Sequence, residues 1–208
     1  MFENSLAREA AEIGYRCLVV VGGDGTVNEV DNGILCSTRS GSIILGIVSA
    51  GSECSFARSL GIALECVGAC SLLTGEGRLV IDAGVVRCQN NGQLIQRYFV
   101  NIVDVGLGSA IVDSWKCLPN HLGRSINREL RTLQGLRCLF NHRNTSVKLR
   151  EGNNVETIFS SDIIIANGQY FGGGMRIAPH TKLCLTSSSA GLPPPYLSPR
   201  STGSFTRL

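Results

Sequence analysis

The chain has 208 residues, of which 43% are hydrophobic and 17% are charged, a balance that excludes a disordered chain and is typical of a globular protein. A net charge of +3 and an aromatic content of 6% argue against a nucleic-acid-binding surface. No apolar run reaches the roughly 18 residues that span a bilayer, so we expect no transmembrane segment.

The first third of the chain alternates between helical and strand patterns. Residues 2–13 carry an apolar stripe at helical spacing, and residues 16–21 form an apolar, β-branched run of the kind that parallel sheets bury on both faces. We predict further helices at 27–35, 53–60 and 63–74, and a second buried strand at 43–48. This alternation predicts a parallel α/β layer over residues 1–76.

A different pattern begins near residue 77, where we place a domain boundary. The runs 78–87 and 96–105 are strand-like, and the Asn-Gly pair Asn91–Gly92 between them predicts a β-hairpin. We predict a helix at 124–140 and strands at 145–150 and 156–166. Residues 77–181 are therefore predicted to be antiparallel β structure with an inserted helix.

The last part of the chain has a different composition. Ser187–Ser204 is rich in serine, and four of the six prolines lie between residues 193 and 199. Such a segment buries too little apolar surface to offset the entropy of ordering. We therefore predict a disordered tail over residues 182–208.

One short motif carries the strongest chemical signal. Gly22–Thr26 reads Gly-Gly-Asp-Gly-Thr, and it joins a buried strand to the helix-like run Val27–Val30. Glycines let an anion approach the backbone N–H groups, and the helix that follows adds its positive end. Asp24 in such a turn suits a group that holds Mg²⁺, orients a hydroxyl or fixes the turn. The motif predicts nucleotide chemistry, with phosphoryl transfer as the leading interpretation.

Further segments accompany this motif in a recognisable order. They are Glu29–Val30, Asn32–Gly33, Leu45–Ser52, Phe56–Gly61, Ile81–Gly84, Phe99–Asn101 and Ala166–Met175. In that order and spacing the chain resembles the catalytic domain of the diacylglycerol kinase and sphingoid long-chain-base kinase family. The resemblance covers residues 1 to 180, roughly, and its most specific parts are Phe56–Gly61 and Ala166–Met175.

The resemblance implies a two-domain kinase. Residues 1–76 would be part of an α/β nucleotide-binding domain, and residues 77–181 part of a β-sandwich domain for the lipid. The implied reaction is ATP-dependent phosphorylation of a lipid alcohol, such as diacylglycerol, a sphingoid base or ceramide, with Mg²⁺ as cofactor. The implied partner is a lipid at a membrane surface, so we expect a cytoplasmic protein, with peripheral membrane contact as a further option.

The same resemblance implies roles for individual residues. Asp24 would be the catalytic residue, an acidic side chain that positions a Mg²⁺-linked water or the acceptor hydroxyl. The charge of Arg58 suits contact with a phosphate, and the alternative for Arg58 is a solvated charge on a helix. An alternative for Asp24 is a turn former that only caps the helix after it. The implied ATP-binding residues are Gly22, Gly23, Asp24, Gly25, Thr26, Glu29, Gly51 and Ser52.

Four departures from the family pattern leave a second interpretation open. The first strand and its phosphate loop are absent, which predicts exposed apolar surface and a free edge on strand 16–21. Glu53-Cys54-Ser55 replaces Gly-Asn-Asp, and Ala110 stands where sphingosine-type kinases carry the acid for the lipid amine. After Pro179 the pattern stops, as in an alternative splice product or gene-model artefact.

The chain therefore has the features of a family member that is truncated at both ends. The alternative function is a non-catalytic relative that binds nucleotide or a partner without turnover. A third reading, NAD kinase, fits less well, because Phe56–Arg58 and Phe171–Met175 match the lipid kinases better.

Overall fold

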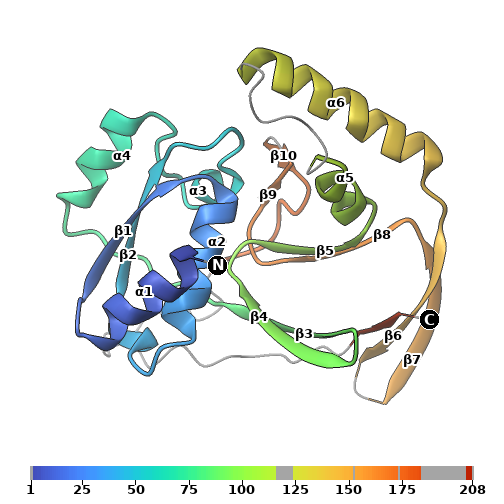
Figure 1. The fold of residues 1–208 in the computed structure, drawn as a ribbon, viewed down its shortest axis with the longest axis horizontal. Coiled ribbons are helices and arrows are strands. Elements are labelled where there is room, and N and C mark those ends of the chain that lie inside the picture. Colours follow the sequence, from blue (N-terminus) through green and yellow to red (C-terminus); the bar gives the residue numbers. More distant parts are fainter. Residues whose placement is uncertain (1, 116–123, 152, 173, 184–204, 208) are drawn as a thin grey trace. The chain divides into compact units, whose positions relative to one another are not determined.

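The computed structural model describes residues 2–115, 124–151, 153–172, 174–183 and 205–207 (Figure 1). The described chain forms two compact units. Unit 1 runs to Ile102 and resumes at Ala166, whereas unit 2 comprises Val103–Ile165 and a short C-terminal strand. These limits differ from residue 76, because the hairpin that follows residue 77 packs on a helix of unit 1. The boundary at residue 76 stays a prediction about the domains of the family.

Unit 1 contains the predicted parallel layer. Strands β1 (Cys17–Gly22) and β2 (Ile44–Ser49) pair in parallel, from Cys17 opposite Ile44 to Gly22 opposite Ser49. Helix α2 (Asp24–Leu35) packs on one face, where Val20, Val27 and Ile47 form part of the core. Helix α1 (Phe2–Glu12) packs against α2. The remaining helical segments are a 3₁₀ turn (Ser40–Ser42), α3 (Ser55–Ser59) and α4 (Cys66–Leu73).

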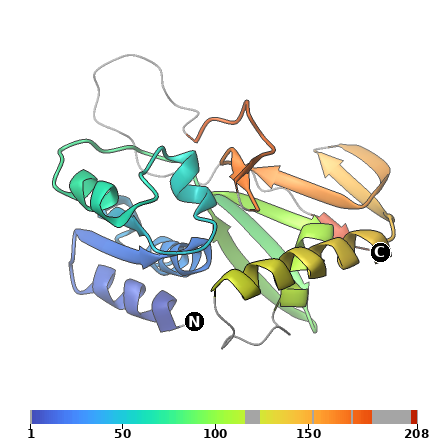
Figure 2. The same cartoon turned by 90° about the horizontal axis from the view of Figure 1, so that it is seen from above.

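The other face of this sheet is only partly covered. Helix α4 lies on that side, opposite α1 in Figure 2, and Leu73 reaches Gly46 of β2. Val19 and Val21 of β1 are 51% and 63% exposed on the same side. The expectation that strand 16–21 is buried on both faces is therefore wrong for its second face. The expectation of exposed apolar surface on this strand is met.

The predicted hairpin forms, with strands shifted from their predicted bounds. Strands β3 (Gly84–Asn90) and β4 (Gln93–Phe99) are antiparallel, with Asn90 opposite Gln93. The turn residues Asn91 and Gly92 have φ angles of 51° and 80°, which is the left-handed pair that a tight hairpin needs. The tight turn fixes the register, so the ladder runs from Gly84 opposite Phe99 to Asn90 opposite Gln93, and residues 78–83 lie outside it.

Unit 2 contains mainly β structure with two helices. Strands β6 (Thr145–Glu151) and β7 (Asn154–Ser160) are antiparallel, and β11 (Phe205–Arg207) pairs antiparallel with β6. Strand β5 (Ile102–Gly106) pairs with β8 (Asp162–Ala166). The helices are α5 (Leu107–Trp115) and α6 (Arg124–Asn141). The inserted helix and the antiparallel strands are as predicted, whereas the sandwich arrangement stays a prediction.

Two long predicted strands are each interrupted. The run 96–105 divides between β4 and β5 around Asn101, and the run 156–166 divides between β7 and β8 at Ser161. The Ser161 carbonyl oxygen accepts a hydrogen bond from the backbone N–H of Leu107 at 3.1 Å and lies 2.8 Å from His142 Nε2. The break between β7 and β8 thus coincides with a carbonyl that bonds residues remote in sequence, which local β-propensity does not reveal.

The C-terminal part is only partly described. In unit 1, β9 (Tyr170–Phe171) and β10 (Met175–Arg176) form a short antiparallel pair. The Leu183 carbonyl then accepts a hydrogen bond from the backbone N–H of Asp82 at 2.8 Å. Most of the predicted disordered tail lies outside the described residues, although its residues 205–207 form β11. Among the described helices, none is long and apolar enough to cross a membrane.

Candidate functional site

The predicted phosphate turn lies where β1 meets α2. Gly23 is the N-cap of α2, with φ −101° and ψ −173°, and its carbonyl accepts the first helical hydrogen bond, from Val27 N–H at 3.0 Å. The N–H groups of Asp24, Gly25 and Thr26 precede that bond, so no carbonyl within the helix can pair with them. The turn therefore presents backbone donors and the positive end of the helix dipole at one place.

The carboxylate of Asp24 joins this turn to a second predicted segment. Oδ2 accepts a hydrogen bond from Ser55 N–H and Oδ1 accepts one from Phe56 N–H, both at 2.9 Å. Asp24 thus caps α3, which is remote in sequence, and α2 has no side-chain cap. Hydrogen bonds to an ionised acceptor are stronger than those between neutral groups. The first structural role of Asp24 is therefore to hold the Gly22–Thr26 turn against the loop before α3.

Two glycines allow the same two segments to touch. A Cβ atom on Gly23 would lie 3.0 Å from the Cα of Gly51, and one on Gly51 would overlap the Cα of Gly23. The backbone N–H of Ala50 also donates to the Gly22 carbonyl at 3.0 Å. The close approach of the two backbones therefore requires glycine at Gly51 and leaves little room for a Cβ atom at Gly23. The structure brings the predicted residues of 22–26 and 51–52 together.

The loop between β2 and α3 contains a strained residue. Cys54 is buried and has φ 47°, a left-handed conformation that is uncommon outside glycine and asparagine. In the family pattern an asparagine stands at this position. Cys54 therefore keeps the backbone turn that lets Ser55 and Phe56 reach Asp24, but with a residue that fits the conformation less well.

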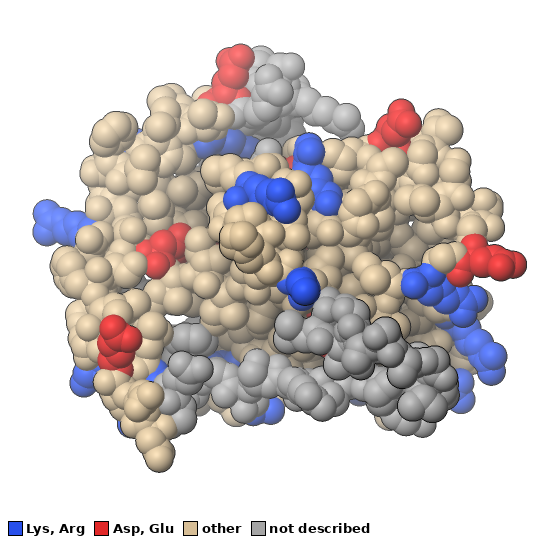
Figure 3. All heavy atoms as spheres, turned by 180° about the vertical axis from the view of Figure 1, so that it is seen from behind, with Lys and Arg blue, Asp and Glu red and all other residues tan. Residues whose placement is uncertain are grey.

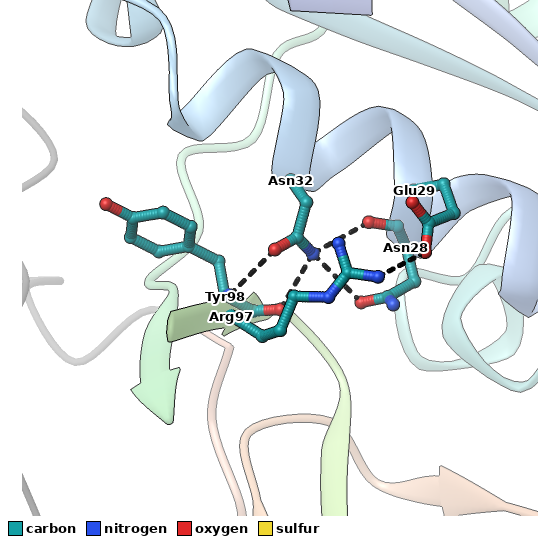
Figure 4. Close-up of polar contacts among 5 residues, drawn as sticks. All are labelled: Asn28, Glu29, Asn32, Arg97 and Tyr98. Carbon is teal, nitrogen blue, oxygen red and sulfur yellow. Dashed lines mark hydrogen bonds and ion pairs between the residues drawn. The ribbon is translucent and has the colours of Figure 1, made fainter. Parts of the chain in front are cut away.

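The other predicted site residues lie around this pair of segments. Gly25 faces open space, since a Cβ atom at this position would meet nothing within 4 Å. Arg58, on α3, is exposed and donates from Nε to the Glu53 carbonyl at 3.4 Å. Glu29 forms an ion pair with Arg97 of β4 at 2.6 Å, further along α2 (Figure 4). Glu29 thus lies beside the hairpin, where it ties α2 to β4.

Asn32 is not among the predicted site residues, although the pair Asn32–Gly33 contributes to the resemblance. The Asn32 side chain is 1% exposed, and its Oδ1 accepts a hydrogen bond from Tyr98 N–H at 2.9 Å. Its Nδ2 donates to the carbonyls of Tyr98 at 2.9 Å and Asn28 at 2.8 Å (Figure 4). One amide therefore fixes α2, and with it the phosphate turn, against β4.

Ser59 was also missed, and it lies inside the Phe56–Gly61 segment. Its Oγ accepts hydrogen bonds from the N–H groups of Gln169 and Tyr170 at 3.1 and 3.2 Å. Asn167 donates to the carbonyls of Asp82 and Val100 at 2.8 and 2.7 Å. Several of the segments that carry the resemblance are thus joined to one another inside unit 1, because Ser59 and Asn167 bond the backbone of other segments.

The space around the turn limits where a nucleotide can lie. Behind the turn, Gly22, Gly23 and Asp24 pack on Cys54 and Ala57, leaving no room for a water molecule. Within the described part of the chain, no three His, Cys, Asp or Glu side chains are grouped as metal ligands. Figure 3 shows Lys and Arg scattered among Asp and Glu on the face in view, without a broad basic patch. An anion at the turn would therefore bind on its open side, through the backbone donors.

Unit 2 contains a cavity of about 380 Å³. Its wall combines apolar side chains with Asp162, Asp113 and the predicted position Ala110. Asp104 lies next to Asp162, and burial, followed by the neighbouring Asp162 carboxyl, raises the pKa of Asp104 to about 6. Two of their oxygens, Asp104 Oδ2 and Asp162 Oδ1, are buried without a hydrogen-bond partner among the described residues. The two carboxyl groups therefore share a site that disfavours two charges.

Comparison with known proteins shows which class of protein this fold and turn resemble. Residues 2–86 match the family model of the diacylglycerol kinase catalytic domain. The matched stretch contains the turn, the Gly51–Ser52 loop, α3 and the start of the hairpin. The resemblance predicted from the motifs is confirmed: this part of the chain is similar to the diacylglycerol kinase catalytic domain.

Individual relatives agree with this class. A protein of Chromohalobacter salexigens described as "probable lipid kinase YegS-like" is 30% identical over 178 residues, which are 86% of this chain and 54% of that protein. The diacylglycerol kinase of Bacillus subtilis is 30% identical over 180 residues, 85% of this chain and 54% of that protein. The chain thus spans about half the length of the curated relatives it matches.

Solved structures support the fold. A crystal structure of a diacylglycerol kinase from Bacillus anthracis superposes with a TM-score of 0.61 at 23% sequence identity. The match covers 87% of this chain and 54% of that one. At this identity the likeness establishes the fold alone, a mixed α/β structure with parallel strands first and antiparallel strands later.

Proposed function

We propose that this chain acts as the catalytic part of an ATP-dependent lipid kinase, which transfers the γ-phosphoryl group of ATP to a hydroxyl of a lipid. The observation that carries the proposal is the Asp24 carboxylate, which holds the Gly22–Thr26 turn against the loop that begins at Gly51. Two glycine-containing segments that meet at the start of a helix form an arrangement that suits phosphate binding. The names of the relatives supply the class of acceptor, a lipid.

Different residues of this chain serve binding and positioning. The N–H groups at the start of α2, in Gly25 and Thr26, bind phosphate oxygens, and Gly51 and Ser52 border the same space. Arg58 adds a positive charge near the phosphates, and Glu29 orders the far side of α2 through Arg97. ATP supplies the phosphoryl group when it is bound, so catalysis rests on positioning and on stabilising charge.

Asp24 is the only acidic group of the turn itself, and each of its oxygens keeps a lone pair beyond the backbone N–H that it accepts. Magnesium in kinases is commonly held by one or two carboxylates and the phosphates, so Asp24 fits a Mg²⁺ ion that arrives with the nucleotide. The same carboxylate lies near the place where an acceptor hydroxyl would be oriented. We therefore assign Asp24 the catalytic role.

The lipid is a diacylglycerol or a sphingoid base or ceramide. Within unit 2, the cavity suits part of such a lipid, because apolar side chains and acidic groups line it together. The apolar side chains include Val105, Val147 and Ile163. Asp113 lies one turn of α5 after Ala110 and lines the same cavity, so an amine would find an acidic partner there. We propose that the chain meets this lipid at a membrane surface, as a peripheral membrane protein.

The test is transfer of ³²P from γ-labelled ATP with Mg²⁺ to mixed micelles of diacylglycerol, ceramide and sphingoid base. We expect one labelled lipid with the full chain, and loss of that label in Asp24→Ala. Glu9→Ala, an exposed carboxylate of α1, is the matched control and should keep the label. Circular dichroism of every variant separates a lost activity from a lost fold.

A second function is favoured by one observation. Cys54 is strained, and the Ser55 hydroxyl is buried without a partner among the described residues, at two positions where the family has an amide and a carboxylate. These exchanges fit a relative that binds nucleotide without turnover. Two results together would establish this second function in place of the first. Calorimetry would show that the chain binds ATP and that Gly51→Ala does not, and the kinase assay would give no labelled lipid from folded protein.

A further inference from the structure

Helix α6 presents an apolar stripe that no described residue of unit 2 covers. Leu133, Leu136 and Phe140 are 64%, 47% and 84% exposed, and Leu139 beside them is 54% exposed. Their spacing of three and four residues places Leu133, Leu136 and Phe140 on one side of the helix. Four large apolar side chains together in water mark an interaction site, whereas single ones are ordinary.

The opposite side of α6 is the one that packs. Trp115 of α5 donates from Nε1 to the Arg131 carbonyl at 3.1 Å, and a Cβ atom on Gly135 would lie 3.8 Å from Ile111. Residues 131 and 135, at a spacing of four, define the side that faces α5, about half a turn from the Leu133 stripe. The apolar stripe is therefore not the packing face of α6; it points away from the helix that anchors α6 to unit 2.

The charge around the stripe identifies its partner. Residues 124–150 contain seven Lys or Arg and a single acid, Glu129, although the whole chain has a net charge of only +3. Arg137, within the helix, and Arg143, just after it, are exposed near Phe140 in sequence. Exposed Leu and Phe beside Arg on one helix are typical of a segment that lies in the interface of an anionic bilayer.

We propose that α6 is a membrane-docking helix, which inserts Leu133, Leu136, Leu139 and Phe140 into the surface of an anionic bilayer while Arg137 and Arg143 contact lipid phosphates. This proposal goes beyond the kinase function and does not depend on turnover. It gives the chain a way to hold its own position at the surface where a lipid would be found. The helix lies on the membrane and does not cross it, consistent with its length and its charges.

The test is sedimentation of the full chain with vesicles of phosphatidylcholine alone and of phosphatidylcholine mixed with phosphatidylserine. We expect binding to the mixed vesicles that weakens as salt is added. Phe140→Ser should weaken that binding about tenfold, because one buried aromatic side chain is lost. Phe159→Ser, which removes a phenylalanine of β7 that is 73% exposed, is the matched control and should bind like the parent chain.

The charges are tested separately from the apolar stripe. Changing Arg137 and Arg143 to Gln should weaken binding to the mixed vesicles about fivefold for each residue, and leave binding to neutral vesicles unchanged. Equal binding by Phe140→Ser and the parent chain, or no binding by folded protein, would overturn the proposal. So would a dimer in gel filtration that Phe140→Ser dissociates, because the stripe would then be a contact between two copies. None of these readouts uses ATP, so a failed kinase assay leaves the result unaffected.

Discussion

Two acidic sites, Asp24 in unit 1 and the Asp104–Asp162 pair in unit 2, have opposite surroundings. In unit 1, both oxygens of Asp24 accept backbone N–H groups at 2.9 Å, and the charge is satisfied by the start of a helix. In unit 2, Asp104 faces Asp162, and one oxygen of each is buried without a partner among the described residues. The contrast shows that a carboxylate stabilises a fold when it meets donors, and costs stability when it meets another carboxylate.

The same contrast bears on function. A charge held by donors is fixed in position and is available to a cation or a hydroxyl, as the proposed role of Asp24 requires. Asp104, whose pKa is raised by burial and by the neighbouring Asp162 carboxyl, responds to pH instead. Variants that remove one partner from each arrangement test this contrast.

The largest effect is expected for Asp24→Ala. The substitution leaves the N–H groups of Ser55 and Phe56 without their acceptor, so the free energy of unfolding should fall by about 3 kcal/mol. Asp24→Asn keeps one acceptor oxygen and should lose about half as much. Urea unfolding followed by circular dichroism measures both. A loss in Asp24→Ala of well under 1 kcal/mol would show that these two hydrogen bonds do not hold the turn.

A smaller effect is expected when the two segments are pushed apart by one methyl group. Gly51→Ala places a Cβ against the backbone of Gly23, and such overpacking should cost about 2 kcal/mol. Gly25→Ala has open space, and a helical alanine should raise stability by up to about 1 kcal/mol. Thermal unfolding of the two variants tests this difference. Similar melting temperatures for Gly51→Ala and Gly25→Ala would contradict the close approach of Gly23 and Gly51.

The smallest effect is the pH dependence of unit 2. The pKa of Asp104 is about 6 in the fold and 3.8 as the ordinary value, so the folded state holds its proton to higher pH than the unfolded state does. The contribution of Asp104 to the free energy of unfolding should therefore fall as the pH rises from about 4 to about 6, and level off above that. Because solvent screens this partly open pair, we expect a fall of about 1 kcal/mol.

The fluorescence of Trp115, the one tryptophan of the chain, reports on unit 2 in this experiment. Asp104→Asn should flatten the fall between pH 4 and 6. Asp31, whose pKa is raised by burial to about 7, adds a dependence of the same sign up to a higher pH. Asp31→Asn is therefore the matched variant. If the fall in unfolding free energy between pH 4 and 6 disappeared in Asp31→Asn but not in Asp104→Asn, the pH dependence would belong to Asp31 and not to Asp104.

The sequence alone carried much of the fold and of the site. Local patterns placed the parallel pair β1 and β2, the hairpin around Asn91–Gly92 and the long helix α6, because each depends on residues that are near one another in the chain. The glycines at 22, 23 and 51 were recognisable, since few other residues allow a backbone to approach so closely. The resemblance to the diacylglycerol kinases followed from the order of such segments.

Tertiary structure decided the rest. No local signal shows that Asp24 caps α3 instead of α2, that Asn32 bonds β4, or that Ser59 bonds residues 169 and 170, since each partner is remote in sequence. The exposure of the α6 stripe was likewise invisible, because an apolar residue has the same pattern whether a neighbour covers it or not. Periodicity tells which side of an element is apolar, but only the packing of distant elements determines whether that side meets protein, water or another partner.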